Sequence, residues 1–385
     1  MFKSIFKTSA LKNRPLKNNA RKFSVLIALL FIFAVIPFAL SGFRNGGSSY
    51  NSSSSSSNGS PSSGPTYATG PSPSAIAIDA SGNVWVANEG NGTAGRTAPG
   101  DSNVTELSPS GATIGTYTAG SYPDAIAIDA SGNVWVANWG GNNVTELSSS
   151  GATIGTYAVG FKPRGIAIDA SGNVWVANVG NGTAGMAPED SNVTELSSSG
   201  ATIGTYAAGN SPHAIAIDAS GNVWVANEGS SNVTELSSSG ALKGTYAYVA
   251  GSGPLAVAID ASGNVWVANW GSSIAGTAAG DSNVTELSPS GAIIGTYVAG
   301  SVPRGIAIDA SGNVWVTNYG SNNVTELSSS GALKGTYAAG DSPYSIAIDA
   351  SGNVWVANYS SANVTKLVSV AKGPQYFPYS GPQYP

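Results

Sequence analysis

The 385-residue chain has no cysteine, a single histidine and few charged residues, which make up 10% of the sequence. The lack of cysteine excludes a disulfide framework, a thiolate-ligated zinc or iron–sulfur site, a catalytic thiolate and a lipid-modified cysteine. A single histidine also excludes a multi-histidine metal centre. Glycine (50 residues) and proline (20 residues) are too scarce for a collagen-like or wholly disordered chain.

Positive charge is concentrated at the N-terminus. Seven of the 16 Lys and Arg residues lie within the first 22 positions, whereas all 21 acidic residues lie from Asp79 onward. From Asn45 onward, 8 basic residues stand against 21 acidic ones, a net charge of −13. We therefore expect no broad basic face and no nucleic-acid partner.

The N-terminal region is typical of an export signal or a membrane anchor. Its basic residues precede an almost wholly apolar, uncharged run from Phe23 to Leu40, which is about long enough to span a bilayer as a helix. Because basic residues stay on the cytoplasmic side, the rest of the chain is predicted to be extracytoplasmic, either secreted or tethered to the membrane. The small residues of Ala39-Leu40-Ser41 leave cleavage and retention both open. Residues 1–43 are assigned to this signal or anchor, and the Ser/Gly-rich residues 44–65 to a flexible linker.

The motif I-D-A-S-G-N-V-W-V-[AT]-N occurs seven times. Its Asp is found at Asp79, Asp129, Asp169, Asp218, Asp260, Asp309 and Asp349. Each repeat unit holds four strand-like runs, rich in β-branched and aromatic residues, between short turn sequences. Four strands recurring every 40 to 50 residues predict an all-β fold. We expect a seven-bladed β-propeller of four-stranded antiparallel blades over residues 66–371.

The two ends of the repeat region predict how the ring closes. Residues 64–70, G-P-T-Y-A-T-G, match the fourth-strand ending of later units but precede the first unit. The last unit has only its first three strands. An N-terminal outer strand is therefore expected to complete the blade formed by these three, which protects an open edge. The tail at 372–385, which repeats G-P-Q-Y, is expected to be extended and solvated.

Each unit reads P-x-[AG]-[IV]-A-[IV]-D-x-x-G-N-V-W-V-x-N followed by N-V-T-x-L, with few departures. This pattern resembles the NHL-repeat propellers, especially their streptogramin (virginiamycin B) lyase-like branch, from about Thr66 to Ala371. The resemblance implies a propeller fold. It also implies a possible lyase activity that opens a macrocyclic depsipeptide ester with a histidine base and a magnesium ion held by acidic residues. Relatives of this kind include lactonases and non-enzymatic binding domains, so fold alone does not decide function.

Residues that every unit keeps are predicted to be scaffold. The tryptophan of the motif, first found as Trp85, is expected to fill the wedge between blades. The motif Asp, first found as Asp79, is expected to accept backbone N–H bonds in its turn. A glutamate recurs in the third strand of six units, beginning with Glu106, and Lys366 replaces it in the last. We expect these glutamates to lie in the strand ladder or face solvent.

Residues that differ between units at one repeated position are the candidates for function. One such position follows the proline that opens the first strand: Ser74, Asp124, Arg164, His213, Leu255, Arg304 and Tyr344. The other ends the second strand: Glu89, Trp139, Val179, Glu228, Trp270, Tyr319 and Tyr359. Both are expected on one face, at the channel mouth, together with insertions at 91–100, 181–190 and 272–280. The predicted ligand-binding residues are Asp124, Arg164, His213, Arg304, Tyr344, Trp139, Trp270, Tyr319 and Tyr359.

These residues support two hypotheses. Arginine forks bind carboxylate or phosphate and aromatic rings stack on sugars or peptides, which favours a monomeric binding module for a small molecule, glycan or protein at the cell surface, without cofactor or metal. The alternative is an enzyme of the streptogramin lyase or lactonase type, a metal-assisted C–O lyase with His213 as its candidate base and Mg²⁺ as its ion. Asp124, Glu89 and Glu228 could approach the mouth, but their spacing does not force them to converge.

Overall fold

The computed structural model describes residues 64–91, 102–181, 190–247, 253–271 and 282–368. All of them belong to one compact unit of the chain, residues 57–385. The predicted signal or anchor, nearly all of the linker and of the three insertions, and the tail lie outside the described residues. No helix in the described part of the chain is long and apolar enough to cross a bilayer.

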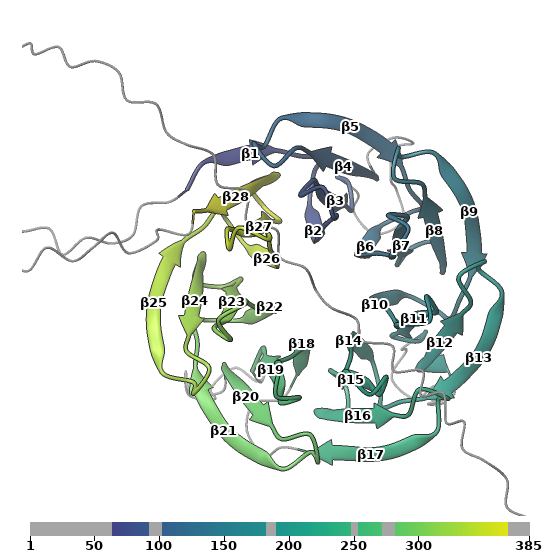
Figure 1. Cartoon of the computed structure of the whole chain (residues 1–385), viewed down its shortest axis with the longest axis vertical. Coiled ribbons are helices and arrows are strands. Elements are labelled where there is room, and N and C mark those ends of the chain that lie inside the picture. The colour runs from purple at the N-terminus through teal and green to yellow at the C-terminus, as the bar shows by residue number, and fades with distance from the viewer. Residues whose placement is uncertain (1–63, 92–101, 182–189, 248–252, 272–281, 369–385) are drawn as a thin grey trace, which may run out of the picture. The chain divides into compact units, whose positions relative to one another are not determined.

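Within the described residues, 28 strands form seven four-stranded antiparallel sheets, arranged as blades in a ring (Figure 1). The all-β, seven-bladed prediction is confirmed. The innermost strands are β2 (Pro73–Ile78), β6 (Pro123–Ile128), β10 (Pro163–Ile168), β14 (Pro212–Ile217), β18 (Pro254–Ile259), β22 (Pro303–Ile308) and β26 (Pro343–Ile348). The second strands are β3 (Val84–Asn88), β7 (Val134–Asn138), β11 (Val174–Asn178), β15 (Val223–Asn227), β19 (Val265–Asn269), β23 (Val314–Asn318) and β27 (Val354–Asn358).

The outermost strand of each blade is the most exposed, whereas the third strands are largely buried. The third strands are β4 (Asn103–Leu107), β8 (Asn143–Leu147), β12 (Asn192–Leu196), β16 (Asn232–Leu236), β20 (Asn283–Leu287), β24 (Asn323–Leu327) and β28 (Asn363–Leu367). The outermost strands are β5 (Thr113–Thr118), β9 (Thr153–Ala158), β13 (Thr202–Ala207), β17 (Leu242–Ala247), β21 (Ile293–Val298), β25 (Leu333–Ala338) and β1 (Thr66–Ala68). The second strands are buried throughout, apart from a half-buried Trp315, while the outermost strands alternate between exposed and half-buried residues.

The ring closes through strand β1, as the sequence predicted. Its sheet runs in the order β1-β28-β27-β26, so the first strand of the chain completes the last blade (Figure 1). Tyr67 of β1 pairs with Val364 and packs its ring against Trp355, with the centroids 5.6 Å apart. Lys366, which stands where the other blades have glutamate, donates a hydrogen bond to the Pro109 carbonyl of the first blade at 2.9 Å. Closure therefore repeats the tyrosine–tryptophan packing of the other blades, and Lys366 adds a contact across to blade one.

The repeated tryptophans fill the wedges between blades, as predicted. Trp85 is fully buried and packs with Val134 and Val136 of the next blade. Tyr117 of the outermost strand stacks on Trp85, with centroids 5.3 Å apart. The same Tyr ring fills the space under Gly151 in the next blade, where an added Cβ would lie 2.0 Å from its Cε1 atom. The glycine, with φ of 80°, is thus required both by its turn and by its neighbour.

Each motif aspartate organises its turn and holds its tryptophan. The Oδ1 atom of Asp79 accepts the Ser81 and Asn83 amides at 2.8 and 2.9 Å, as expected. Its Oδ2 atom also accepts the Trp85 indole N–H at 3.1 Å, a contact the sequence did not reveal. The carboxylate therefore ties the turn to the core of the blade.

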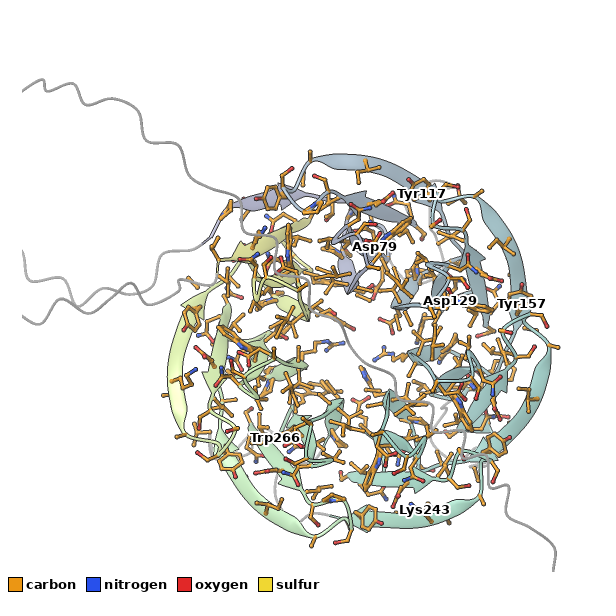
Figure 2. The ribbon with its side chains drawn as sticks, viewed as in Figure 1. Asp79, Tyr117, Asp129, Tyr157, Lys243 and Trp266 are labelled. Carbon is orange, nitrogen blue, oxygen red and sulfur yellow. The ribbon has the colours of Figure 1, made fainter. Side chains whose placement is uncertain are left out.

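The repeated glutamates lie in the strand ladder, as one of the two predicted alternatives has it, and Glu146 pairs there with Trp135 and Gly155. The other alternative, a solvent-facing charge, is wrong. Glu146 is 3% exposed, and its two oxygens accept the Tyr157 hydroxyl at 2.7 Å and the Asn133 amide at 3.1 Å. Burial together with this carboxylate raises the pKa of Tyr157 to about 12. The tyrosines lie toward the outside of the ring and the motif aspartates further in (Figure 2). The glutamates are buried because two hydrogen-bond donors from the same blade replace water.

Candidate functional site

A β-bulge at the start of each innermost strand presents the variable residues. In blade three, Pro163 pairs with Asn178 and Gly165 with Ala177, so Arg164 is left without a ladder partner. The same shift follows the first proline of five other innermost strands, and in blade six the irregularity leaves Gly305 as well as Arg304 without a ladder partner. Bulges redirect side chains at the rims of barrels and near functional sites. Each blade can therefore vary this residue without losing a ladder hydrogen bond.

The residue before each of these prolines has a left-handed backbone. Ser72, Tyr122, Lys162, Ser211, Val302 and Ser342 all have φ between 51° and 56°, and Gly253 has φ of 87°. A β-branched residue such as Val302 rarely adopts this conformation. The turn also brings the end of the second strand back to it, because the Tyr319 amide donates to the Val302 carbonyl at 2.9 Å. Both variable positions are thereby held on the same face.

All seven bulged residues line one cavity of about 180 Å³ on the axis of the ring: Ser74, Asp124, Arg164, His213, Leu255, Arg304 and Tyr344. Their predicted placement around the channel mouth is thus observed. We call these seven residues the mouth belt. The cavity wall below them consists of small and aliphatic residues of the innermost strands, such as Ala125 and Ile306.

One side of the mouth belt is a chain of polar contacts from blade two to blade five. Arg164 Nε lies 3.3 Å from Asp124 Oδ2, and Arg164 Nη1 lies 2.9 Å from His213 Nε2. Asp124 is 5% exposed in its side chain and Arg164 27%. Burial lowers the pKa of Arg164, but the Asp124 carboxylate and more distant acids outweigh it and raise that pKa overall. Arg164 is therefore a charged residue already paired inside the protein.

His213 is held neutral in this chain. Its Nδ1 donates to the Leu255 carbonyl at 2.9 Å, which leaves the lone pair on Nε2 to accept from Arg164. Burial and the charges of Arg164 and Arg304 hold the pKa of His213 well below its usual range. A general base needs its lone pair directed at the substrate. In this arrangement the lone pair is occupied by Arg164.

The other side of the mouth belt is a stack of side chains. The Arg304 Cζ atom lies 3.8 Å from the Tyr344 ring centroid and 5.6 Å from that of Tyr319. Tyr344 stacks in turn on Tyr359, with centroids 5.4 Å apart. Arg304 Nη2 also donates to the Tyr344 hydroxyl. Tyr359, Tyr344 and Arg304 thus form a stack, and Tyr319 lies beside it, edge-on to Tyr344 with ring centroids 6.4 Å apart. These residues belong to blades six and seven.

The two sides meet across blade one. The Tyr344 hydroxyl lies 3.5 Å from Asp124 Oδ1, although blade one stands between their blades. Ser74, the residue of blade one in the mouth belt, is short and donates to the Pro123 carbonyl at 2.7 Å. A small side chain at this point leaves room for the contact. The polar chain from Leu255 to Arg304 is consequently continuous.

Glu89 adds a second carboxyl group beside Asp124. It accepts the Tyr359 hydroxyl at 2.9 Å and interacts electrostatically with Asp124. Burial, followed by the Asp124 charge, raises the pKa of Glu89 to about 8. Burial and the same glutamate raise the pKa of Tyr359 to about 12. At neutral pH Glu89 is therefore mainly protonated.

The remaining predicted residues lie at different distances from this cluster. Trp139 contacts Tyr122 edge-on and lies 5.4 Å from Lys162 Nζ and 6.0 Å from Arg164 Cζ. Tyr319 and Tyr359 belong to the stack around Arg304. Within the described residues, Trp270 makes no ring contact or side-chain hydrogen bond with any of the others. The structure thus brings together eight of the nine predicted residues and leaves Trp270 apart on blade five.

Thr317 is a contributing residue that the sequence reasoning missed. It occupies the place of an alanine found in the six other motifs, and its hydroxyl accepts the Gly305 amide at 2.7 Å. It also lies 3.0 Å from the Tyr344 carbonyl, to which it donates. Thr317 therefore ties the bulge that carries Arg304 to the strand that carries Tyr344. The single departure from alanine in the repeated motif was the signal for it.

The magnesium ion that the lyase resemblance implies is not matched by the described residues. No group of three or more His, Asp or Glu side chains converges among them. Asp124 faces the Arg164 guanidinium, and Glu89 is protonated at neutral pH. Magnesium is normally held through ionised carboxylates that keep their charge for the ion. The described part of the mouth suits an anion better than a cation.

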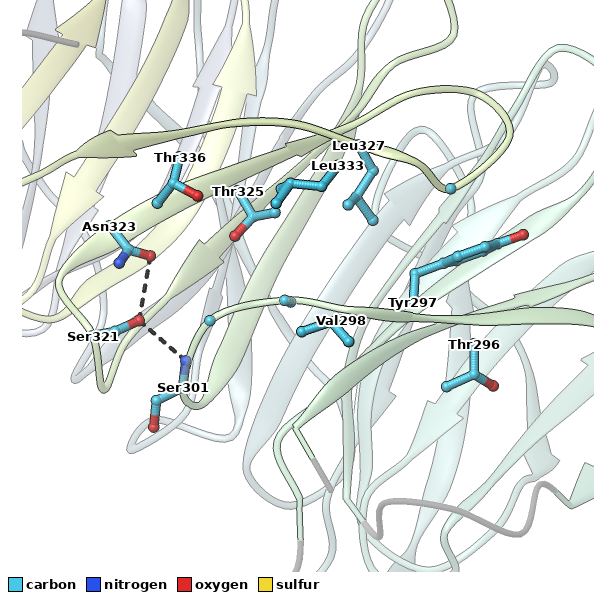
Figure 3. A pocket seen from close by; sticks show the side chains of 13 residues that line it. Thr296, Tyr297, Val298, Ser301, Ser321, Asn323, Thr325, Leu327, Leu333 and Thr336 are labelled. Atoms are coloured by element: carbon cyan, nitrogen blue, oxygen red, sulfur yellow. Dashed lines mark hydrogen bonds between the residues drawn. The ribbon is translucent and has the colours of Figure 1, made fainter. Parts of the chain in front are cut away.

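A larger hollow of about 470 Å³ lies between β21 and the outer half of blade six (Figure 3). The Ser321 hydroxyl accepts the Ser301 amide at 3.1 Å and donates to Asn323 at 3.2 Å. Its lining side chains, such as Tyr297 and Thr325, occupy repeated positions and include no charged group. This hollow is lined by residues that the blades share, whereas the mouth is lined by residues that differ from blade to blade.

Comparisons with known proteins agree with this architecture. The profile of the virginiamycin B lyase family matches residues 56–277, more than half of the chain. No curated protein matches. A streptogramin B lyase structure aligns with a TM-score of 0.65 and 17% identity, covering 78% of this chain and 96% of that one.

Two further structures share the fold. The virginiamycin B lyase of Staphylococcus aureus aligns with a TM-score of 0.63 and 17% identity, covering 77% of this chain and 94% of that one. The hydrazine synthase of Kuenenia stuttgartiensis aligns with a TM-score of 0.69 and 18% identity, covering 79% and 97%. Such identities show a common fold alone. On the strength of its profile match, the chain belongs to the virginiamycin B lyase family.

Proposed function

We propose that this protein is an exported propeller that binds a ligand at the mouth belt. The observation that carries the proposal is Arg304, which lines the cavity and has no carboxylate within ion-pair distance among the described residues. Its Nε atom is buried without a hydrogen-bond partner in that part of the chain. An unpaired guanidinium with a buried donor is costly to a fold and is normally retained where an anion completes it.

The proposed location is outside the cytoplasm, at the cell surface. Support comes from the basic N-terminal segment, the apolar run at 23–40 and the Ser/Gly-rich linker that follows. A binding domain on a flexible tether samples ligands near the membrane without a fixed orientation. A small molecule, a glycan or a protein segment remains a suitable ligand.

The second candidate function is that of a lyase, which family membership favours. The streptogramin B and virginiamycin B lyases that share this fold give the reaction to test. Against it stand the occupied Nε2 of His213 and the missing metal-binding group in the described residues. Incubation of the full chain with a streptogramin B and added Mg²⁺, followed by mass spectrometry, tests this candidate. A ring-opened product lost in His213→Ala would replace binding by catalysis as the main function.

Glycan and peptide arrays probed with the full chain test the binding proposal. We expect at least one class of ligand to be retained by the protein and to be lost in Arg304→Ala. The matched control is Lys243→Ala, which removes a cation from outer strand β17 at the rim (Figure 2). Binding that survives Arg304→Ala but fails in Lys243→Ala would place the site outside the mouth belt.

A further inference from the structure

We infer that the mouth binds a single carboxylate through the edge of the Arg304 guanidinium. Its ligands would then be small carboxylic acids or chains that end in one carboxylate. This inference rests on the proposed function, since it names the chemistry of the same site.

The stack around Arg304 restricts how a ligand can reach it. Tyr344 covers one face of the guanidinium at 3.8 Å, and Tyr319 lies toward it at 5.6 Å. Its only hydrogen bond among the described residues is the one from Nη2 to Tyr344. The open donors therefore lie in the plane of the group. A planar acceptor with two oxygens, such as a carboxylate, matches this edge with two parallel hydrogen bonds.

The charges around the cavity favour one negative charge on the ligand. Arg164 already faces Asp124, and His213 is neutral, so Arg304 provides the unpaired positive charge of the mouth belt. Asp124 lies 3.5 Å from the Tyr344 hydroxyl, to which Arg304 also donates, and it repels further negative charge. A phosphate monoester carries close to two negative charges at neutral pH. A carboxylate carries one, which matches the single free guanidinium.

The size of the cavity limits what enters. Pockets that enclose drug-sized ligands measure about 300–1,000 Å³. The cavity here is about 180 Å³, so it admits an acidic end group while the rest of the ligand stays outside. Two sources share this chemistry: an acidic sugar such as a uronate, and the C-terminal carboxylate of a peptide.

Thr317 makes the inference testable without touching Arg304. Its hydroxyl joins the Gly305 amide to the Tyr344 carbonyl and so fixes Arg304 against Tyr344. Replacing it by alanine restores the residue of the other six blades, which all fold without this hydroxyl. Thr317 is a positioning residue, and its removal should loosen the guanidinium rather than unfold the blade.

The experiment is titration calorimetry of the full chain with glucuronate and with an acetylated tripeptide bearing a free C-terminus. Each acid is compared with its uncharged amide, and glucose 6-phosphate is the dianionic comparison. We expect at least one acid to bind about tenfold more tightly than its amide and than the phosphate, which corresponds to about 1.4 kcal/mol. The acid that binds tighter identifies the source of the carboxylate.

Variants then locate the site. Arg304→Lys keeps the charge but loses the planar fork, so affinity for the acid should fall about tenfold or more. Thr317→Ala should weaken binding several-fold, and Thr317→Ser, which keeps the hydroxyl, should restore it. Equal binding of acid and amide, or unchanged affinity in Arg304→Lys, would overturn the inference. If array ligands still depend on Arg304 while no acid binds, the binding function stands and the carboxylate assignment fails.

Discussion

The wall of the ring and its mouth use the same kinds of side chain in opposite ways. In the wall, Glu146 is fully hydrogen-bonded by Tyr157 and Asn133, and the same triad recurs with few changes. At the mouth, Arg304 lies against Tyr344 without a carboxylate partner among the described residues. Repetition therefore marks polar groups that stabilise the fold, and departure from repetition marks groups that are left for something else to bind.

The largest expected effect concerns the closure of the wall. Deleting residues 1–71 removes strand β1 and with it the Tyr67 ring that packs on Trp355. Loss of this half-buried ring together with the backbone pairing of β1 to β28 costs about 3–5 kcal/mol, and the freed edge of β28 promotes association. The melting temperature should fall by several degrees. The matched control, deletion of residues 1–63, keeps β1 and should melt like the full chain. Equal melting of both deletions would show that β1 does not hold the ring closed.

A direct test compares how much a polar group of the wall and one of the mouth contribute to the free energy of unfolding. Glu146→Ala leaves the Tyr157 hydroxyl and the Asn133 amide without their hydrogen-bond acceptor. The free energy of unfolding should fall by about 2–3 kcal/mol. Arg304→Ala removes a cation–π contact and should cost about 1 kcal/mol or less, because no buried partner charge is left behind. Urea unfolding of both variants measures the difference. A larger loss for Arg304→Ala would mean that the mouth is part of the structural core.

Glu89 makes the mouth sensitive to pH in a direction that can be stated. Its pKa is about 8 in the folded chain, against an ordinary value of 4.5, so the unfolded chain releases this proton first. Between these pH values the native state binds more protons, and its contribution to stability falls as pH rises. Glu89→Gln should flatten the decline measured between pH 5 and 8.5. The control Glu228→Gln occupies the same position in blade four and should keep it. If stability fell with pH as steeply in Glu89→Gln as in the unchanged protein, another group would be responsible for the decline.

The smallest effect tests the strained turns beneath the mouth. Val302→Gly relieves a left-handed valine, which costs about 1–2 kcal/mol, but adds backbone freedom to the unfolded chain. The net gain should be about 0.5 kcal/mol. The opposite change, Gly253→Ala at the same position of blade five, has room for the added Cβ and should destabilise through its backbone alone. If Val302→Gly and Gly253→Ala both lowered the stability, packing and not backbone strain would govern these turns.

The sequence predicted the repeated features well because each is encoded locally. The seven motifs specified the strands, and the G-P-T-Y-A-T-G segment specified the closing strand. The positions after each first proline specified the mouth. These periodic patterns can be read from one sequence before the fold is known.

What could not be predicted depends on contacts between distant blades. Nothing in the sequence shows that Tyr344 reaches Asp124 past Ser74, or that Arg164 occupies the lone pair of His213. In the sequence the repeated glutamates resemble surface charges, because the hydrogen bonds that Glu146 accepts from Tyr157 and Asn133 form only in the folded blade. The raised pKa of Glu89 likewise arises from burial beside Asp124, a residue of the next blade.

The packing of each outer tyrosine under the turn glycine of the next blade has a consequence for how many blades the ring contains. The ring of Tyr117 lies under Gly151 in the same way as the ring of Tyr157 lies under Gly200. The internal junctions are therefore interchangeable, and the chain could gain or lose a pair of units without changing any of them. The closing junction repeats this packing, because Tyr67 lies under Gly111 in the same way. It differs in the Lys366 contact and in joining the two ends of the repeat region. The blade count is thus set by the two ends of the repeat region, while the units between them remain free to be copied and to diverge at the mouth.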